Sequence, residues 1–361
     1  MEKNNNFGVA NAPLGKRRYF LPDLDEKGVV LIMVLWIIAI LSVIAFEFSY
    51  AMRTEVKIVR NFQEELQLYA LAEGGVERSI AELVYKHDPR VQMKRKALKS
   101  EEFPPEKKEW VTDGRDYRLT FDPGVCSVKI LGEAGKMNIN LVSGILLSKI
   151  ITNLGVEGEA RDILVDSLLD WRDPDDLYRL NGAENDYYQS LPEPYECKNG
   201  NLDSIEELLL VRGVTPELFY GKKGTLPEGE EDEKTNRIGL KDIFSIYALG
   251  EQVDINSATL PVLRFSLGLP SEMARAIIRA RKEKVFENQQ DLLQRVPEFG
   301  PFWGEIGRLI LFQSTNPFYT IEAKAQSKNG KSIRGLKVIV KIDRREKERY
   351  KIIQWLDAFV S

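Results

Sequence analysis

The feature that most constrains this chain is an uncharged stretch near its N-terminus, residues 29–46, in which Ser42 is the only polar side chain. As a helix, this stretch would be about 27 Å long, close to the thickness of the hydrocarbon core of a bilayer. Basic residues at positions 16–18 and at Lys27 precede it, so the positive-inside rule keeps the N-terminus in the cytoplasm. The sequence therefore predicts one membrane-spanning helix, with the rest of the chain on the far side.

Composition excludes several classes of function. The chain has 361 residues, enough for two or three domains, and a net charge of −4 that gives no reason to expect a polyanionic partner. His87 is the only histidine, which argues against most histidine metal sites and against Ser–His–Asp catalysis. Cys126 and Cys197 are too few for a zinc site but enough for one disulfide outside the cytoplasm. Two free thiols are the equal alternative.

The apolar stretch continues into an amphipathic helix. Apolar side chains recur mostly every three or four residues as far as position 83, the spacing of one helix face. We therefore expect one helix over residues 29–86, with an apolar stripe on its second half that packs against a domain.

Strand patterns flank a long helical segment. Alternating or β-branched runs predict strands at 115–122, 126–133, 318–327, 333–344 and 351–355. Asn329-Gly330 is a strong signal for a hairpin between the third and fourth of these. The pattern of residues 139–314 is helical, so the sequence predicts an α+β fold whose sheet is interrupted by an all-α insertion.

The insertion contains a repeated unit. Residues 137–142 and 253–259 both contain Ile-Asn, and each leads into two short helices joined by a glycine-containing turn. The second copy resembles helix-hairpin-helix modules, which bind DNA phosphates through backbone N–H groups. Here Pro270 stands where a second hairpin glycine is usual, and it has no N–H to donate. A structural role is therefore expected, and a membrane-anchored DNA-binding protein is the alternative.

An acidic segment with proline and glycine follows the first helix pair. It reads Asp-Trp-Arg-Asp-Pro-Asp-Asp over residues 170–176 and Gly-Ala-Glu-Asn-Asp-Tyr-Tyr over 182–188. Carboxylates at such spacing suit a hard cation that needs six to eight oxygen ligands. Helix capping by some of these side chains is the simpler alternative. A metal-dependent hydrolase is a third hypothesis, which no pair of nucleophile and base supports.

The junction before the apolar stretch resembles the leader junction of type IV pilins and type II secretion pseudopilins. In those families a prepilin peptidase cuts after the glycine, here Gly28, and methylates the new N-terminus, here Val29. Most members have glutamate at the fifth mature position, where this chain has Met33. That absence is characteristic of minor pseudopilin K, which caps the filament tip. An uncleaved signal anchor is the alternative, and acidic residues at positions 23–26 make the leader unusual.

With the motifs at 170–176 and 182–188 and the late Asp-Ile-Asn at 254–256, the chain resembles the minor pseudopilin K family of type II secretion systems. The resemblance implies a long N-terminal helix packed on a pilin-like antiparallel sheet, with a large all-α insertion of helix-hairpin-helix-like (SAM-like) repeats. The expected divisions are a leader at 1–28, the helix at 29–86, an α/β domain at 87–138 and 315–361, and the helical insertion at 139–314.

The same resemblance implies a function. It describes a non-enzymatic subunit that caps the periplasmic pseudopilus and helps to initiate it during protein export. Its partners would be the other minor pseudopilins of the tip complex, the inner-membrane assembly platform and the prepilin peptidase, with no nucleic acid. It would cross the inner membrane once, with its globular part in the periplasm. Structural calcium is implied in the insertion, and the expected ligands are Asp173, Asp175, Asp176, Glu184 and Asp186.

Overall fold

The computed structural model describes residues 26–91, 93, 110–122, 124–221, 238–330, 332–343 and 345–357. The chain divides into two compact units, residues 1–63 and residues 64–361, which are described separately. Most of the predicted leader at 1–28 lies outside the described residues, and so does the charged segment at 226–234.

The first unit contains most of helix α1, which runs over Glu26–His87. The predicted helix at 29–86 is therefore present as one continuous element, a few residues longer at its start. Large apolar side chains of residues 29–46 are exposed, and Met33 is among them. Among the described helices, α1 is the one long and apolar enough to cross a membrane, by length and composition.

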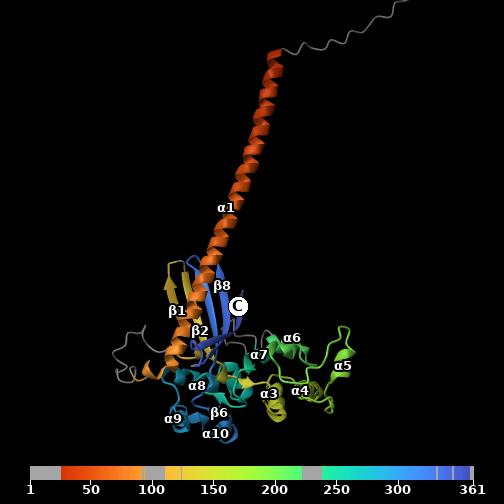
Figure 1. Ribbon diagram of the computed structural model, residues 1–361, viewed down its shortest axis with the longest axis vertical. Coiled ribbons are helices and arrows are strands. Elements are labelled where there is room, and N and C mark those ends of the chain that lie inside the picture. The colour runs from red at the N-terminus through yellow and green to blue at the C-terminus, as the bar shows by residue number, and fades with distance from the viewer. Residues whose placement is uncertain are drawn as a thin grey trace, which may run out of the picture. The chain divides into compact units, whose positions relative to one another are not determined.

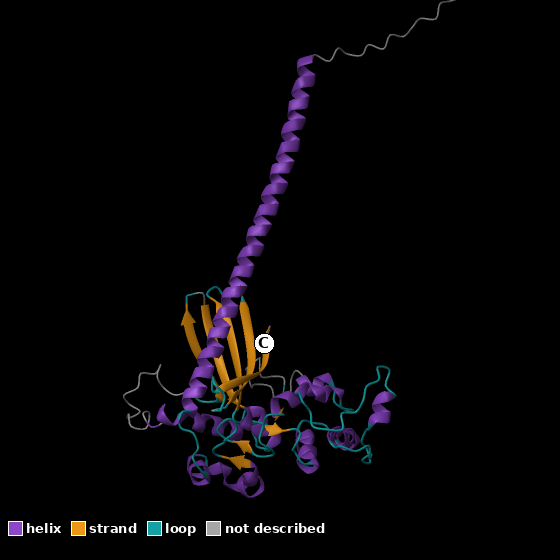
Figure 2. Ribbon diagram, in the orientation of Figure 1, coloured by secondary structure: helices purple, strands orange, loops and turns teal. Residues whose placement is uncertain are grey.

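The second unit is built around a five-stranded antiparallel sheet (Figures 1 and 2). Every predicted strand is present, and its ends lie within two residues of those expected. The strand order is β1-β2-β7-β8-β9. The strands are β1 (Asp113–Phe121), β2 (Gly124–Gly132), β7 (Phe318–Ser327), β8 (Ile333–Ile342) and β9 (Tyr350–Asp357). The predicted hairpin joins β7 to β8, and Gly330 there adopts a φ of 71°, which glycine tolerates.

The last part of α1 packs against this sheet through a dedicated apolar core. The helix side chains in this core recur at helical spacing: Leu68, Leu71, Ala72, Val76, Ile80 and Leu83. Gly75 faces the sheet, where a Cβ would lie 2.7 Å from the Cys126 sulfur and 2.9 Å from a Val128 methyl carbon. A glycine at this point lets helix and sheet approach closely, which outweighs its cost of about 1 kcal/mol in helix propensity.

The insertion leaves and rejoins the sheet at one place, because Gly132 at the end of β2 pairs with Tyr319 at the start of β7. Between them lie two successive runs of elements. The first run comprises η3 (Glu133–Gly135), β3 (Met137–Asn138), α3 (Gly144–Asn153), α4 (Gly158–Arg172), α5 (Asn185–Gln189), η4 (Ile205–Leu210), α6 (Pro216–Tyr220), α7 (Leu240–Ile243) and β4 (Phe244–Ser245). The second comprises β5 (Val253–Asp254), η5 (Val262–Ser266), α8 (Ser271–Glu283), α9 (Gln289–Arg295), η6 (Pro297–Phe299), α10 (Gly300–Ile306), η7 (Gly307–Leu309) and β6 (Ile310–Leu311).

The two runs are repeats of one scaffold, as the sequence predicts. Each begins with a two-residue strand that pairs in parallel with a strand at its own end, β3 with β4 and β5 with β6. The expected first helix of the second repeat is present, and most of it, η5, is π-helical. We call the segment from β3 to β4 the first repeat and the segment from β5 to β6 the second repeat.

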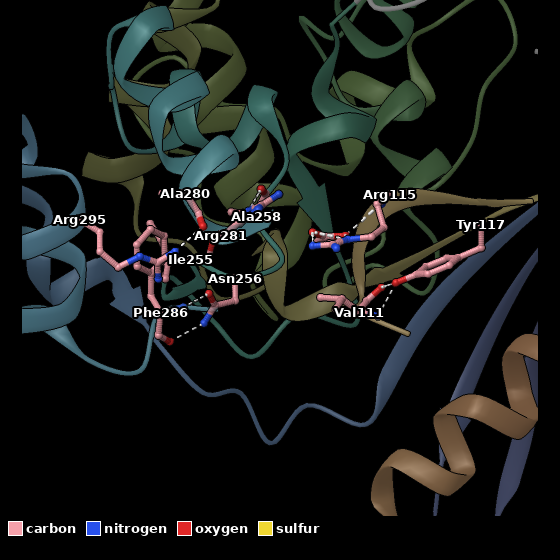
Figure 3. Close-up of polar contacts among 11 residues, drawn as sticks. Val111, Arg115, Tyr117, Ile255, Asn256, Ala258, Ala280, Arg281, Phe286 and Arg295 are labelled. Atoms are coloured by element: carbon pink, nitrogen blue, oxygen red, sulfur yellow. Dashed lines mark hydrogen bonds and ion pairs between the residues drawn. The ribbon is translucent and has the colours of Figure 1, made fainter. Parts of the chain in front are cut away.

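The repeats share their polar contacts as well as their element order. In the second repeat, Arg281 donates to the carbonyl oxygens of Ile255 and Ala258 (Figure 3). In the first repeat, Arg172 donates in the same way to the carbonyls of Ile139 and Val142. Both arginines come from the second helix of their repeat, so each fastens that helix to the segment after the first short strand.

An asparagine side chain in each repeat makes a second set of hydrogen bonds to the backbone. Asn256 accepts from the Phe286 N–H and donates to the Phe286 carbonyl (Figure 3). It also donates to the Phe312 carbonyl. Asn140 accepts from the Leu202 N–H and donates to the Leu202 carbonyl. In the Ile-Asn pairs that reveal the repeat in the sequence, the asparagine side chain therefore satisfies backbone groups, and the isoleucine carbonyl accepts from the arginine.

Candidate metal centre

The acidic turn, residues 170–186, joins the end of α4 to the start of α5. Helix α4 ends because Asp173 adopts extended backbone and Pro174, which follows, has no N–H to continue the ladder. Helix α5 begins after Glu184, which is extended as its N-cap residue. The ends of two helices therefore hold the carboxylates from the two halves of the turn.

Three of the five predicted ligands come together. Asp173, Asp175 and Glu184 each offer a carboxylate oxygen, and the three oxygens lie within 4.8 Å of one another. The other two predicted ligands are engaged elsewhere. Asp176 accepts a hydrogen bond of 2.7 Å from the Asn199 side chain, and Asp186 accepts one of 2.9 Å from the Tyr187 N–H.

Glu184 is the most unusual group in this cluster. It is 1% exposed, and neither of its oxygens receives a hydrogen bond from an N–H or O–H group of the described residues. Burial, and then the neighbouring Asp170, Asp173 and Asp176, raise the pKa of Glu184 to about 7. The Cys197 thiol, a weak donor, is hydrogen-bonded with the Glu184 side chain, and a buried carboxylate with so little support is costly unless it is protonated or binds a cation.

One basic side chain of the turn, Arg179, already forms ion pairs with two of its carboxylates. The Arg179 guanidinium bonds to Asp170 and to Asp173, at 2.5 Å in each case. Burial still raises the pKa of Asp170, which is completely buried. Arg179 therefore holds the loop in place and neutralises part of the turn, and it leaves Glu184 and Asp175 without an ion pair among the described residues.

The donor set fits a hard divalent cation. The clustered atoms are all carboxylate oxygens, which calcium prefers, and one oxygen of Asp173 is also buried without a partner among the described residues. Cys197 lies near Glu184, but burial raises the pKa of its thiol to about 11, so it stays protonated and is a poor metal ligand near neutral pH. Calcium needs further oxygens, which backbone carbonyls and water could supply.

Asn199 is a candidate ligand that sequence reasoning missed. Its amide nitrogen donates to Asp176, and its amide oxygen is buried without a partner among the described residues. It adopts a φ of 47°, which asparagine tolerates better than most residues. It lies beyond α5, outside both acidic motifs, so no spacing in the sequence points to it.

Gly182 has a steric role in the same turn. A Cβ at this position would lie 1.7 Å from a carboxylate oxygen of Asp170. The glycine in the Gly-Ala-Glu motif therefore leaves the space that the buried Asp170 carboxylate fills. Glu184 of the same motif contributes to the carboxylate cluster, so the glycine and the glutamate both belong to this turn.

The second repeat does not offer a phosphate site of the helix-hairpin-helix kind. Pro270 has no N–H, and the neighbouring Leu269 N–H already donates to the Leu263 carbonyl at 3.2 Å. Backbone donors that would hold a DNA phosphate are therefore missing from the hairpin at these two residues. The geometry does not favour the DNA-binding alternative.

The two cysteines are not joined. Cys126 and Cys197 are both buried free thiols, each in a different apolar core. Cys126 lies on β2 with its sulfur facing α1, whereas Cys197 packs beside the acidic turn in the insertion. Of the two alternatives left open by the sequence, the structure contains the free thiols, because each sulfur belongs to its own core.

Comparison with known protein families gives two matches. Residues 134–221 match the family described as type II secretion system protein K, and residues 250–305 match the helix-hairpin-helix motif. The first match contains the whole acidic turn together with Asn199, and the second covers most of the second repeat.

Individual relatives agree with the first match. The chain is 23% identical to type II secretion system protein K of Pseudomonas aeruginosa over 78% of this chain and 80% of that protein. It is 36% identical to the Pectobacterium carotovorum protein K over 19% of this chain and 21% of that protein. The matched region spans 60 to 61% of three other such relatives, including that of Aeromonas hydrophila, which is 27% identical.

A solved structure supports the fold. The chain aligns with a chain in the crystal structure of the GspK–GspI–GspJ complex from the type 2 secretion system of enterotoxigenic Escherichia coli. The alignment has a TM-score of 0.52 at 14% identity and covers 83% of this chain and 98% of that chain. At this identity the similarity describes the architecture: a long helix, an antiparallel sheet and an inserted helical segment.

Proposed function

Because this chain belongs to the type II secretion system protein K family, we propose that it is a minor pseudopilin that acts in protein export without catalysing a reaction. The observation that carries this proposal is the match of residues 134–221 to that family. The long apolar first part of α1 supports it, since it can lie in a membrane or among other apolar helices.

Deletion of the gene in its host tests the export role. Without the protein, proteins that normally reach the medium should accumulate in the periplasm, and the intact chain supplied in trans should restore export. Unchanged export in the deletion strain would contradict the proposal. The fraction of a secreted enzyme found in the medium measures the outcome.

The proposal includes a place at the tip of a periplasmic filament, where the chain helps to initiate assembly with other minor pseudopilins and the inner-membrane platform. Met33 supports this place, because pseudopilins that stack beneath a neighbour use a carboxylate at that position and this chain has none. A Met33→Glu variant should leave the protein stable but reduce export. Full export by this variant would show that the missing carboxylate does not matter.

Processing by a prepilin peptidase is a further part of the proposal. Cleavage after Gly28 would remove the leader and leave a methylated Val29 as the first residue of α1, in a protein that crosses the inner membrane once. The mass of the mature protein purified from membranes tests this step. A mass that includes residues 1–28 would instead indicate a permanent signal anchor.

We also propose that the acidic turn binds calcium as a structural ion. Asp173, Asp175 and Glu184 would hold it, with Asn199 as an additional oxygen donor. The bound ion would supply positive charge to Asp175 and Glu184, which make no ion pair with the described residues, and it would share Asp173 with Arg179. Asp176 and Asp186 are not part of this cluster of carboxylates and would lie outside the first set of ligands.

Equilibrium dialysis with radioactive calcium on the full chain in detergent tests this site. Glu184→Gln should lower the affinity about 100-fold, because the variant keeps the shape of the side chain and removes its charge. Asp186→Asn is the matched control in the same turn and should bind like the wild type. Equal losses in both variants would indicate that only the general negative charge of the turn matters.

A further inference from the structure

An apolar hollow opens in the first repeat, where the turn between α3 and α4 meets α6. Its volume is about 390 Å³, within the roughly 300–1,000 Å³ of pockets that bind ligands. The walls come from this turn, from the start of α4, from α6 and the residues before it, and from Ile238. The apolar side chains that line the hollow are Leu154, Val156, Ala160, Ile163, Leu218 and Ile238.

Most of this apolar surface is still open to solvent. Of the six side chains only Ile238 is buried, whereas Ala160 is exposed and the other four are half-buried. Covering apolar surface in a concave place is favourable, because each part of an incoming apolar group meets several walls at once. The hollow is therefore suited to take an apolar side chain from outside.

The charge around the hollow is negative. Glu217, exposed on α6, is the one titratable side chain among its lining residues. Glu157 and Glu159, also exposed, adjoin the lining residues Val156 and Ala160 in the chain. None of these three carboxylates forms an ion pair with the described residues. A basic group that arrives beside an apolar side chain would therefore find free carboxylates.

The basic side chains nearby do not cancel this charge. Arg161 forms an ion pair of 2.7 Å with its neighbour Asp162. The Arg212 guanidinium donates to the Gly182 carbonyl at 3.0 Å and lies over the Tyr187 ring, both of which belong to the segment around the acidic turn. With both arginines counted, carboxylates around the hollow still outnumber basic groups by four to two.

The same excess extends over the whole first repeat. Its sequence, residues 137–245, has 22 acidic and 11 basic side chains, whereas the second repeat, residues 253–311, has 7 acidic and 8 basic ones. The segment 222–237, which lies outside the described residues, contributes five acidic and four basic side chains to the first count and does not reverse it. A field of this sign attracts basic partners and repels acidic ones.

We propose that this hollow binds a basic segment of a partner protein that carries an apolar side chain such as leucine. The apolar side chain enters the hollow, and lysine or arginine side chains beside it pair with Glu217, Glu157 and Glu159. Nucleic acid is disfavoured, because the same carboxylates repel phosphates. The site uses none of the proposed calcium ligands, and it goes beyond the proposed assembly role without depending on it.

Fluorescence anisotropy tests the proposal on the full chain in a nonionic detergent, with protein-free micelles as the blank. The probe is a short fluorescein-labelled peptide with a single leucine between two pairs of lysines, and it should bind saturably. Ala160→Trp fills the hollow from an exposed position and should raise the Kd at least about tenfold. Ala160→Ser is the matched control and should leave the Kd unchanged. Unchanged binding in Ala160→Trp would contradict the proposal.

A charge reversal at the rim tests the ionic part. Glu217→Lys should raise the Kd about fivefold. Glu193→Lys, at an exposed position of the same repeat outside the hollow, is the matched control and should change it less than about twofold. Equal losses would show that only the overall charge of the repeat attracts the peptide, which would overturn the proposal. If Ala160→Trp does not fold, this pair still decides, because both positions are exposed.

Two altered peptides and one measurement without peptide complete the test. Replacing the leucine by serine, or each lysine by glutamine, should weaken binding at least about tenfold, and equal binding of either peptide would contradict the proposal. Sedimentation of the wild type and Ala160→Trp at several protein concentrations should agree. Self-association that is lost in the variant would mean that a second copy of the chain occupies the hollow, and it would overturn the assignment to a basic partner.

Discussion

The two repeats of the insertion share one scaffold. They differ in the segment that leads from the second helix to the closing strand. In both, an arginine binds two carbonyls and an asparagine binds a distant backbone segment. In the second repeat, the chain returns to its closing strand through short helices, α9 and α10. In the first, it makes a much longer excursion that contains the acidic turn and Asn199.

This difference separates what holds the fold from what can bind a ligand. The shared contacts satisfy backbone groups that burial would otherwise leave unpaired, so they belong to stability. The one cluster of metal-ligating carboxylates that the described residues form lies in the excursion of the first repeat. The two copies of the scaffold therefore share the contacts that hold the fold, and the first copy adds the segment with the proposed calcium site.

The largest effect should come from removing the arginine that each repeat uses as an anchor. Arg281→Ala should lower the free energy of unfolding by about 4 kcal/mol, because two buried carbonyls lose their donor and a cavity remains. Arg172→Ala should cost about 2 kcal/mol, since Arg172 is only half-buried. Urea unfolding followed by tryptophan fluorescence measures both. Arg279→Ala, on the exposed face of α8, is the control, and an equal loss there would contradict the anchoring role.

A smaller effect, confined to the first repeat, should follow from filling the space at Gly182. Gly182→Ala should lower the free energy of unfolding by about 3 kcal/mol and abolish calcium binding, because the new Cβ displaces the buried Asp170 carboxylate. Gly250→Ala is the control, because Gly250 lies between the repeats and a Cβ there would meet no atom within 4 Å. It should leave the free energy of unfolding nearly unchanged. Retained calcium affinity in Gly182→Ala would show that the turn tolerates rearrangement.

The pH dependence of stability should distinguish the repeats next. The pKa of Glu184 is about 7 in the folded protein against an ordinary 4.5, so the folded state holds a proton that the unfolded state releases between these values. Stability of the calcium-free protein should therefore be fully present below pH 4.5 and fall by about 2 to 3 kcal/mol as the pH rises through 7.

The Glu184→Gln variant isolates this effect from that of Asp170, whose pKa is shifted in the same direction. Unfolding midpoints in urea across this pH range should change less in the variant than in the wild type. Added calcium should restore wild-type stability at pH 7.5 and leave the variant unchanged. A parallel pH dependence in both proteins would place the titration elsewhere.

The smallest expected effect concerns Asn199. Asn199→Gly keeps the positive φ accessible while removing the amide oxygen, and it should weaken calcium binding about tenfold, or about 1.4 kcal/mol. Metal-free stability should change by less than about 1 kcal/mol, because the lost hydrogen bond to Asp176 is exposed. Calorimetric titration of calcium measures the affinity, and an unchanged value would remove Asn199 from the ligand set.

Local patterns in the sequence were sufficient to predict most of the fold. The strand ends, the Asn329-Gly330 hairpin and the continuous helix follow from periodicity and turn chemistry, which act over a few residues. The repeat was visible through its Ile-Asn pairs. The helix after Leu260 is present as predicted, but the local pattern does not show that most of it is π-helical.

The candidate site was predicted less completely. The acidic motifs identify the right turn, but only the folded backbone decides that Asp173, Asp175 and Glu184 converge while Asp176 and Asp186 bond elsewhere. Asn199 and the engagement of Arg179 depend on contacts between segments that the sequence does not place side by side. The domain boundaries and the calcium ion itself remain predictions.

Co-purification of the full chain with its own organism's counterparts of GspI and GspJ tests the central claim, that this protein is a minor pseudopilin, most directly. The three proteins expressed together, with a tag on one counterpart only, should elute as a single equimolar complex in size-exclusion chromatography. If the two counterparts form a complex while this chain elutes alone, the proposed function is contradicted.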